Sequence, residues 1–297
     1  MSLKNLNRTQ RSAVEATKGP VLIFAGAGSG KTRVLTHKIY YLIREGLYNP
    51  EDILAVTFTN KAAKEMKLRI GKLLKNSNSQ IDIAIGTFHS ICARILRNHI
   101  QHLGYTNNFV IYDSADKRDL IRIILEKYNI SKTMLTPKGV ASQISLFKNQ
   151  MISTEEIGQK ARTIAEKKLA EVFPAYQKAL RDNNAVDFDD LLLLPLELFE
   201  KHPRILTAYQ KKWKYVLVDE YQDTNLPQFL LVSKLAEKHQ QICVVGDDDQ
   251  SIYGWRGADI RNILDFEKVF PNCTIFTLEK NYRSTQKILD AATIVVQ

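Results

Sequence analysis

The amino-acid sequence predicts an α/β fold in which a parallel, doubly wound sheet carries an inserted all-helical subdomain. Short apolar runs separated by helical stretches mark both ends of the chain, and strands that alternate with helices favour a parallel sheet. The runs are 21–24, 53–58, 81–87, 215–218, 242–247 and 273–278. Between these two parts, residues 114–194 give little strand signal. The middle of the chain therefore interrupts the sheet domain rather than extending it.

Helical stretches occur in all three parts of the chain, with different character. In the two α/β parts they follow the apolar runs, at 33–39, 61–74, 90–102, 227–238 and 259–270. In the middle they are amphipathic and rich in Lys and Glu, at 116–128, 137–150 and 153–183. The middle is therefore expected to fold as a helical subdomain with a solvated outer face.

Composition limits the class of protein. The 297 residues are 44% hydrophobic, enough for one large domain or two smaller ones with buried cores. No apolar run approaches membrane-spanning length, and no signal-peptide segment opens the chain. Cys92, Cys243 and Cys273 form neither a metal-spacing pair nor an even disulfide set, so we expect a cytoplasmic protein. The net charge of +10 fits a polyanionic partner, although it also fits a merely solvated basic surface.

The most informative segment is Ala25–Thr32, which stands between an apolar run and a helical stretch. Strand, glycine-rich loop and helix are the context of a phosphate-binding loop, in which backbone N–H groups and the helix N-terminus face phosphate oxygens. Lys31 would reach the β- and γ-phosphates, and the Thr32 hydroxyl would hold Mg²⁺. The alternative is a glycine-rich turn without a ligand, because Ala25 stands where the usual pattern has Gly.

Asp219 and Glu220 follow the apolar run 215–218. A parallel strand delivers the residues at its carboxyl end to the crevice where ligands bind. Asp219 could hold a hydrated Mg²⁺, and Glu220 could take a proton from an attacking water. A pair of acidic residues at a strand end is also common without such a role.

Three further loops carry candidate side chains. Gln250, after the run 242–247, would lie near a γ-phosphate if that strand lay beside the first, and Arg283 could reach a transition-state phosphate. Taken on their own, these two segments are better explained as an acidic turn and a surface arginine. Tyr253, Trp255 and Arg256 lie close together in a stretch that contains Gly254 and Gly257, which favours an exposed loop over a core position; exposed aromatic side chains stack on unpaired bases.

Taken in order, these segments resemble the motifs of the superfamily 1A DNA helicases, the UvrD, Rep and PcrA family. Leu6 and Asn7 with Gln10 are similar to the adenine-reading Q motif, and Ala in the first position of the phosphate loop is usual in this family. The other matching segments are 57–63 and 86–90 (DNA contacts), 187–191, 218–223 (the DExx box), 245–258 and 281–284.

The resemblance implies a role for each matched side chain. It implies catalysis by Lys31, Glu220, Gln250 and Arg283, and Mg²⁺ binding by Thr32 and Asp219. It implies ATP binding by Gln10, Ala25, Gly26, Ala27, Gly28, Ser29, Gly30, Lys31, Thr32, Arg33, Tyr282 and Arg283. It implies DNA binding by Thr57, Phe58, Asn60, His89, Tyr253, Trp255 and Arg256.

The resemblance also implies a domain organisation. Residues 1–113 and 187–290 would form a RecA-like phosphate-loop domain, 1A, and residues 114–186 the helical insert, 1B. Residues 291–297 would begin a second RecA-like domain that this chain does not complete.

The leading hypothesis is the ATP- and single-stranded-DNA-binding half of an ATP-dependent 3′→5′ DNA helicase or translocase acting in DNA repair or replication. Its partners would be single-stranded DNA, single/double-strand junctions and the C-terminal helicase domains of the same protein, with no membrane. Without those domains the chain is expected to hydrolyse ATP weakly and not to unwind duplexes. One alternative is a nucleotide-gated DNA-binding module without turnover. Another is a small-substrate kinase, in which the aromatic loop would have no role.

Overall fold

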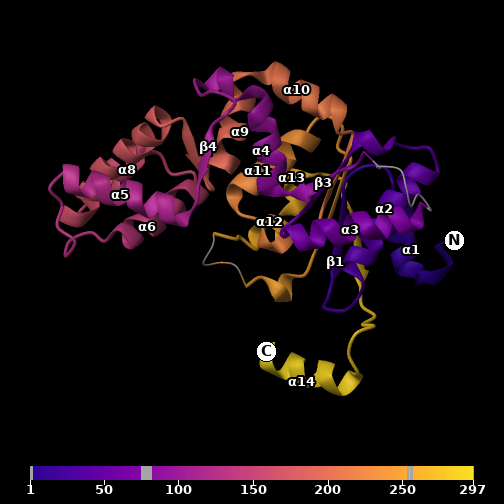
Figure 1. The fold of residues 1–297 in the computed structure, drawn as a ribbon. Helices are drawn as coiled ribbons and strands as arrows, with labels where there is room; N and C mark the ends of the chain where they lie inside the picture. Colours follow the sequence, from indigo (N-terminus) through magenta and orange to yellow (C-terminus); the bar gives the residue numbers. More distant parts are fainter. Residues whose placement is uncertain (1–2, 75–81, 253, 255–256, 297) are drawn as a thin grey trace. The chain divides into compact units, whose positions relative to one another are not determined.

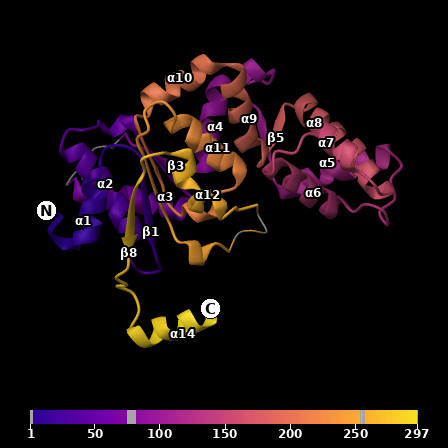
Figure 2. The ribbon, with the colours of Figure 1, turned by 180° about the vertical axis from the view of Figure 1, so that it is seen from behind.

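The computed structural model describes residues 3–74, 82–252, 254 and 257–296, and the chain divides into two compact units (Figures 1 and 2). The sheet unit comprises residues 1–91, 204–224 and 232–297, and the helical unit comprises residues 92–203 and 225–231. The predicted insert, residues 114–186, lies within the longer segment of the helical unit.

Six strands form the sheet of the first unit, in the order β3-β2-β6-β7-β1-β8, and every neighbouring pair is parallel. The strands are β1 (Val21–Ala25), β2 (Ile53–Thr57), β3 (Ala84–Thr87), β6 (Tyr215–Val218), β7 (Ile242–Gly246) and β8 (Thr274–Leu278). The predicted α/β fold with a parallel sheet is therefore confirmed. Strand β7 lies between β6 and β1, so the segments that follow these three strands emerge at one edge of the sheet.

The central strands are buried on both faces, which explains why they read as continuous apolar runs. Alternate residues of each strand, such as Ile23, Ala55 and Val245, join one hydrophobic core with helices on that face. These helices are α1 (Arg8–Glu15), α2 (Lys31–Arg44) and α3 (Asn60–Leu73). In the view of Figure 1, α2 and α3 lie in front, whereas Figure 2 brings β8 and α12 to the front.

The other helices of the sheet unit are shorter or lie near its ends. They are α10 (Pro203–Lys212), α12 (Arg261–Leu264), α13 (Phe266–Val269) and α14 (Gln286–Val296). The helices α4 (Phe88–His99) and α11 (Leu226–Ala236) contribute residues to both units, and α10 begins at the last residue of a helical-unit segment, Pro203. The single helix predicted over 259–270 is in fact α12 and α13, which are separated at Asp265.

The helical unit contains α5 (Ser114–Lys127), α6 (Pro137–Asn149), α7 (Thr154–Lys160), α8 (Ile164–Asp182) and α9 (Asp190–Lys201). It also holds a short parallel ladder of β4 (Val110–Tyr112) and β5 (Ala185–Asp187), which the sequence did not predict. The predicted helix over 153–183 is two helices, because Thr163 is extended and forms a capping box with Glu166 at the start of α8.

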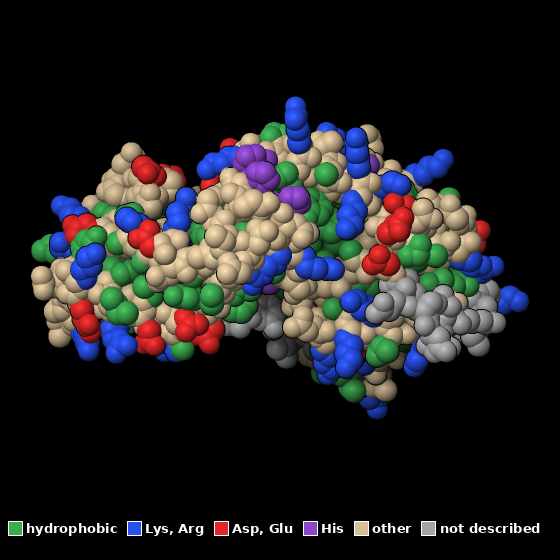
Figure 3. Space-filling view, turned by 45° about the horizontal axis from the view of Figure 1, so that its top comes forward, with side chains coloured by type: hydrophobic (Ala, Val, Ile, Leu, Met, Phe, Trp, Pro, Cys, Tyr) green, Lys and Arg blue, Asp and Glu red, His purple; other side chains and the backbone are tan. Residues whose placement is uncertain are grey.

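The surface of the helical unit is charged with both signs. Lys and Arg side chains alternate with acidic ones over this unit, on the left in Figure 3. Some of them pair along a helix, such as Lys168 with Glu171 and Lys178 with Asp182. Exposed pairs of this kind contribute little to stability, so these helices owe their position to their apolar inner faces. In the ranges described here, no helix is long and apolar enough to cross a membrane.

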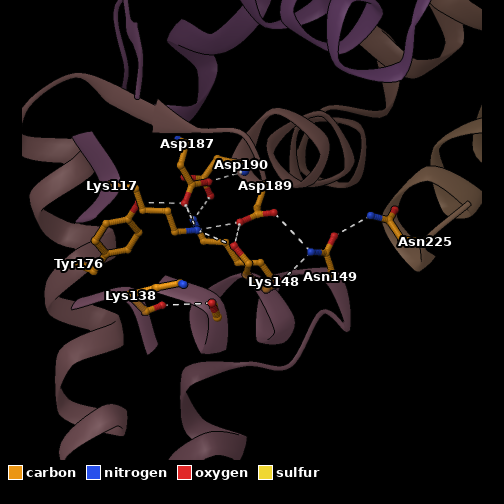
Figure 4. A network of polar contacts seen from close by, with 11 residues as sticks. Lys117, Lys138, Lys148, Asn149, Tyr176, Asp187, Asp189, Asp190 and Asn225 are labelled. Atoms are coloured by element: carbon orange, nitrogen blue, oxygen red, sulfur yellow. Dashed lines mark hydrogen bonds and ion pairs between the residues drawn. The ribbon is translucent and has the colours of Figure 1, made fainter. Parts of the chain in front are cut away.

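A buried charge network lies inside the helical unit (Figure 4). The ammonium group of Lys148 lies 2.9 Å from Asp187 Oδ2 and 2.8 Å from Asp190 Oδ1, and all three side chains are almost inaccessible. The buried Tyr176 hydroxyl donates to the same Asp187 oxygen at 2.9 Å. Burial alone would lower the pKa of Lys148, but Asp187 and Asp190 outweigh it and raise that pKa. Lys148 is therefore charged and fixes the start of α9 onto α6.

The same network extends through the loop before α9. Asp189 accepts hydrogen bonds from Lys117 at 2.9 Å and Ser145 at 2.6 Å, and Asn149 donates to its other oxygen at 3.4 Å. Asn225 donates in turn to Asn149 at 2.6 Å. Polar side chains from α5, α6 and α8 thus hold residues 187–190 in place, and the donors and acceptors of this network pair with one another.

Lys148→Met should lower the free energy of unfolding by about 3–5 kcal/mol, because it leaves buried carboxylates without their cation. Lys138→Met is the matched control, since Lys138 lies on the same helix α6 with an exposed side chain. Urea unfolding followed by circular dichroism measures both variants. Equal midpoints for the two variants would contradict the role assigned to the network.

Candidate nucleotide-binding site

The carboxyl ends of β1, β7 and β6 bring three predicted segments together. The phosphate loop follows β1, Asp219 and Glu220 follow β6, and Asp247 and Gln250 follow β7. Gln250 was expected near a γ-phosphate if the strand before it lay beside the first strand, and β7 does pair directly with β1. Crevices of open α/β sheets form at this edge, so these side chains share one site.

The phosphate loop has the backbone shape that its glycines allow. Gly28 and Gly30 have φ values of 73° and 97°, in the left-handed region, and α2 begins immediately afterwards at Lys31. A Cβ on Gly28 would lie 2.6 Å from the Arg283 Cβ, so the close approach of residues 281–283 requires glycine there. The Tyr282 N–H donates to the Gly28 carbonyl at 2.9 Å, which fixes this second loop onto the first.

A pocket of about 330 Å³ opens in front of the phosphate loop. All four predicted catalytic residues, Lys31, Glu220, Gln250 and Arg283, line it. Its other lining residues are Ala27, Gly28, Gly30, Thr32, Arg33, Arg69 and Tyr282. Of the other predicted ATP ligands, Ala25, Gly26, Ser29 and Gln10 are not among its lining residues.

Lys31 is held between two carboxylates. Its ammonium group lies 3.3 Å from Asp247 Oδ2 and 3.5 Å from Glu220 Oε2, and the side chain is only 9% exposed. The Gln250 amide donates to the same oxygen of Asp247. Asp247 therefore holds both the lysine and the glutamine that were predicted to face the phosphates.

Asp219 and Thr32, the two predicted Mg²⁺ ligands, contact each other. The Thr32 hydroxyl donates to Asp219 Oδ2 at 3.4 Å, so two hard oxygen donors converge as Mg²⁺ requires. Burial, and next the neighbouring Glu220 carboxylate, raise the pKa of Asp219 to about 7. Among the residues that the structure describes, no cation makes a hydrogen bond to this buried carboxylate, which fits a place where a divalent ion would compensate its charge. Asp223 is affected in the same way, since burial and then Glu220 raise its pKa to about 6.

Gln10 lies behind the phosphate loop. It is buried and completes a capping box with Asn7 at the start of α1, and its amide donates to the Ser29 carbonyl at 2.8 Å. Asn7 donates to the Tyr282 hydroxyl at 2.9 Å. The segment with the predicted adenine residues thus braces the phosphate loop, and adenine contact by Gln10 and Tyr282 stays a prediction.

Four of the predicted DNA residues are described by the structure, and none of these four lines the pocket. Thr57 is buried at the end of β2, and the ring of the half-buried Phe58 packs edge-on against Phe88, with 5.7 Å between centroids. Asn60 is exposed at the first position of α3, and His89 is half-buried in the first turn of α4. The predicted DNA contacts Tyr253, Trp255 and Arg256 lie outside the described residues.

Sequence reasoning gave no role to three residues that organise the site. Asp247 and Gln222 were within matched segments, but nothing in the sequence distinguished them from their polar neighbours. Arg69 lies on α3, where an exposed cation next to Glu65 reads as an ordinary helix pair. Asp247 reaches the site through the strand order and Gln222 through the turn after β6, neither of which the sequence displays, and Arg69 lines the pocket from α3.

The parallel sheet, the glycine loop leading into α2 and the acidic residues after β6 define a RecA-like phosphate-loop fold. The model of the UvrD/REP helicase N-terminal domain matches residues 6–271, and the chain belongs to this family. It is 49% identical over 295 residues to the ATP-dependent DNA helicase PcrA of Bacillus subtilis (strain 168). It is 48% identical over 295 residues to the PcrA helicases of Staphylococcus epidermidis and Staphylococcus aureus. Each match covers 99% of this chain and 40% of the relative, so the chain spans 40% of the length of these curated relatives.

Asp219→Asn should stabilise the chain in the absence of nucleotide and Mg²⁺. An acid whose pKa is raised by folding favours the folded state only while protonated, so its contribution is lost as pH rises from about 4 towards 7. At pH 8 the ionised Asp219 should cost on the order of a few kcal/mol, which asparagine avoids.

Thermal unfolding in EDTA, at pH 8 and at pH 5, measures this effect. The melting temperature of the variant should exceed that of the wild type by several degrees at pH 8 and by much less at pH 5. A variant less stable than the wild type at pH 8 would show that Asp219 is ionised and well compensated without a cation.

Proposed function

We propose that this chain binds and hydrolyses ATP in response to single-stranded DNA, as the N-terminal part of an ATP-dependent DNA helicase or translocase. The observation that supports this most is the convergence of Lys31, Glu220, Gln250 and Arg283 on one pocket at the carboxyl edge of the sheet. Residues 1–113 and 187–290 correspond in this proposal to domain 1A, residues 114–186 to domain 1B, and residues 291–297 to the start of a second RecA-like domain.

The phosphate loop would hold the triphosphate through its backbone N–H groups and the N-terminus of α2. Lys31 would exchange its two carboxylate partners for β- and γ-phosphate oxygens, which are equally good acceptors of a charged hydrogen bond. Thr32 and Asp219 would hold Mg²⁺, which when bound neutralises charge on the phosphates.

Glu220 would act as the general base. Water attacks the γ-phosphorus while the bond to the β–γ bridging oxygen breaks, and the water proton passes to the Glu220 carboxylate. Gln250 and Arg283 line the same pocket, from which they would orient that water and stabilise charge on the transferring phosphoryl group.

The DNA part of the proposal rests on the family and on the residues that follow β2 and β3. Relatives at 48–49% identity are named ATP-dependent DNA helicases. Phe58 and His89, with Tyr253, Trp255 and Arg256, would line the single-strand track or couple it to ATP. The 3′→5′ polarity, the binding of single/double-strand junctions and the weak activity of these residues without C-terminal domains are part of the same proposal.

The proposal is tested by measuring phosphate release with and without oligo-dT. The protein used is the natural polypeptide at its full length. The wild type should release phosphate faster with oligo-dT. Glu220→Gln should bind ATP with wild-type affinity and lose about 10²- to 10⁴-fold in kcat, because it keeps the shape of the side chain and removes the base.

Glu237→Gln, an exposed acid of the sheet unit, is the matched control and should hydrolyse ATP like the wild type. Equal rates for the Glu220 variant and the wild type would remove Glu220 from the mechanism. Nucleotide-dependent DNA affinity without any phosphate release would favour the alternative of a binding module without turnover.

A further inference from the structure

Gln222 connects the predicted general base to the segment that follows β7. Its side chain is 1% exposed. The amide nitrogen donates to Glu220 Oε2 at 3.1 Å, and the amide oxygen accepts the backbone N–H of Asp247 at 3.0 Å. One side chain therefore contacts both acidic segments of the site.

The backbone on both sides is shaped around this contact. Glu220 has a φ of 53°, in the left-handed region that non-glycine residues rarely adopt, and the turn Tyr221–Asp223 follows it. A Cβ on Gly246 would lie 2.7 Å from the Gln222 amide oxygen, so the contact requires glycine at the end of β7. Ser251 also donates to the Gln222 carbonyl, at 3.4 Å.

A purely structural role would account for the contact of the amide oxygen but not for those of the amide nitrogen, which also donates to Asp223 Oδ2 at 3.5 Å. The amide oxygen satisfies the Asp247 N–H, which would be costly to leave unpaired in the interior. The amide nitrogen, however, donates to a Glu220 carboxylate that is 37% exposed and could be solvated by water instead. The contact of the amide nitrogen therefore has a different effect, which is to hold the Glu220 carboxylate in one orientation.

The two oxygens of Glu220 are thereby made different. Oε2 lies 3.1 Å from the Gln222 amide nitrogen and 3.5 Å from the Lys31 ammonium group. Across the described parts of the chain, Oε1 makes no hydrogen bond or ion pair. The oxygen with unused lone pairs is the one that can accept a proton from water.

We propose that Gln222 is a positioning residue for ATP hydrolysis, which orients Glu220 so that Oε1 is the basic oxygen and ties this orientation to residues 247–251. The inference rests on the proposed hydrolysis and adds to it a physical link between the segment after β7 and Glu220. Because Asp247 also holds Lys31 and Gln250, a shift of the segment after β7 would be transmitted through Gln222 to the base.

Gln222→Glu tests this most directly, because it keeps the shape and the acceptor for Asp247 N–H but replaces the donor with a second acid. We expect the ATP dissociation constant to stay within about threefold and kcat to fall about 10- to 100-fold. A fall in kcat at unchanged ATP affinity is the readout that a general loss of stability would not give.

Gln210→Glu is the matched control. Gln210 is also buried in the sheet unit, where its amide donates to the Lys234 carbonyl at 2.7 Å, and it does not line the pocket. This variant should lose stability while its folded fraction keeps the wild-type kcat. Gln222→Asn is the second test variant, since a side chain one methylene shorter cannot span both partners, and its kcat should fall at unchanged ATP affinity.

The outcomes distinguish a failure of the proposed ATP hydrolysis from a failure of the role of Gln222. A wild type that releases no phosphate would overturn the proposed function itself. A wild type that hydrolyses ATP, with Gln222→Glu keeping the wild-type kcat like the Gln210 control, would overturn only the role of Gln222. If the glutamate variant does not fold, wild-type kcat in Gln222→Asn would overturn it equally.

Discussion

The pairing of β7 with both β6 and β1 is the constraint on which the rest of the site depends. Hydrogen bonds between these parallel strands fix their register, with Val244 beside both Leu22 and Val218. The segments that follow the three strands therefore emerge next to one another. Lys31, Glu220 and Asp247 come from positions far apart in the sequence, yet their charged groups lie within 3.5 Å contacts. The chemistry of these side chains determines which reaction the site can support, and the strand order brings the side chains together.

Buried carboxylates are compensated by lysine side chains in the helical unit but not in the same way in the sheet unit. In the helical unit, Lys148 and Lys117 compensate Asp187 and Asp189, and the Tyr176 hydroxyl donates to the same Asp187 oxygen as the lysines. The other oxygens of the two carboxylates accept from the Asp190 backbone N–H and from Asn149. In the sheet unit, Asp219 is equally buried, and within the described part of the chain its carboxylate accepts only from the Thr32 hydroxyl and the Glu220 backbone. The first arrangement is typical of structure, and the second of a site whose charge a ligand would balance.

Much of the fold could be predicted because both faces of the central strands are buried. That burial makes β1, β2, β6 and β7 continuous apolar runs, which are easy to recognise. Glycine in the phosphate loop is similarly informative, since the left-handed backbone at Gly28 and Gly30 leaves little choice of residue. The break between α7 and α8 was missed because the capping box at Thr163 competes locally with a helical pattern that continues on both sides. Gln222 was missed for another reason: its partners are brought to it by strand pairing and by the unusual backbone of Glu220.

The central claim is that this edge of the sheet binds a nucleoside triphosphate through Lys31. Calorimetric titration of Mg²⁺ and ATP into this chain tests it, with Lys31→Ala as the variant and Lys64→Ala, an exposed lysine on α3, as the control. Loss of a charged hydrogen bond is worth about 1.5–3 kcal/mol, so the Lys31 variant should bind about 10- to 100-fold more weakly while the control binds like the wild type. Equal affinity in all three proteins would contradict the account, because the two carboxylates around Lys31 would then face the phosphates without their cation.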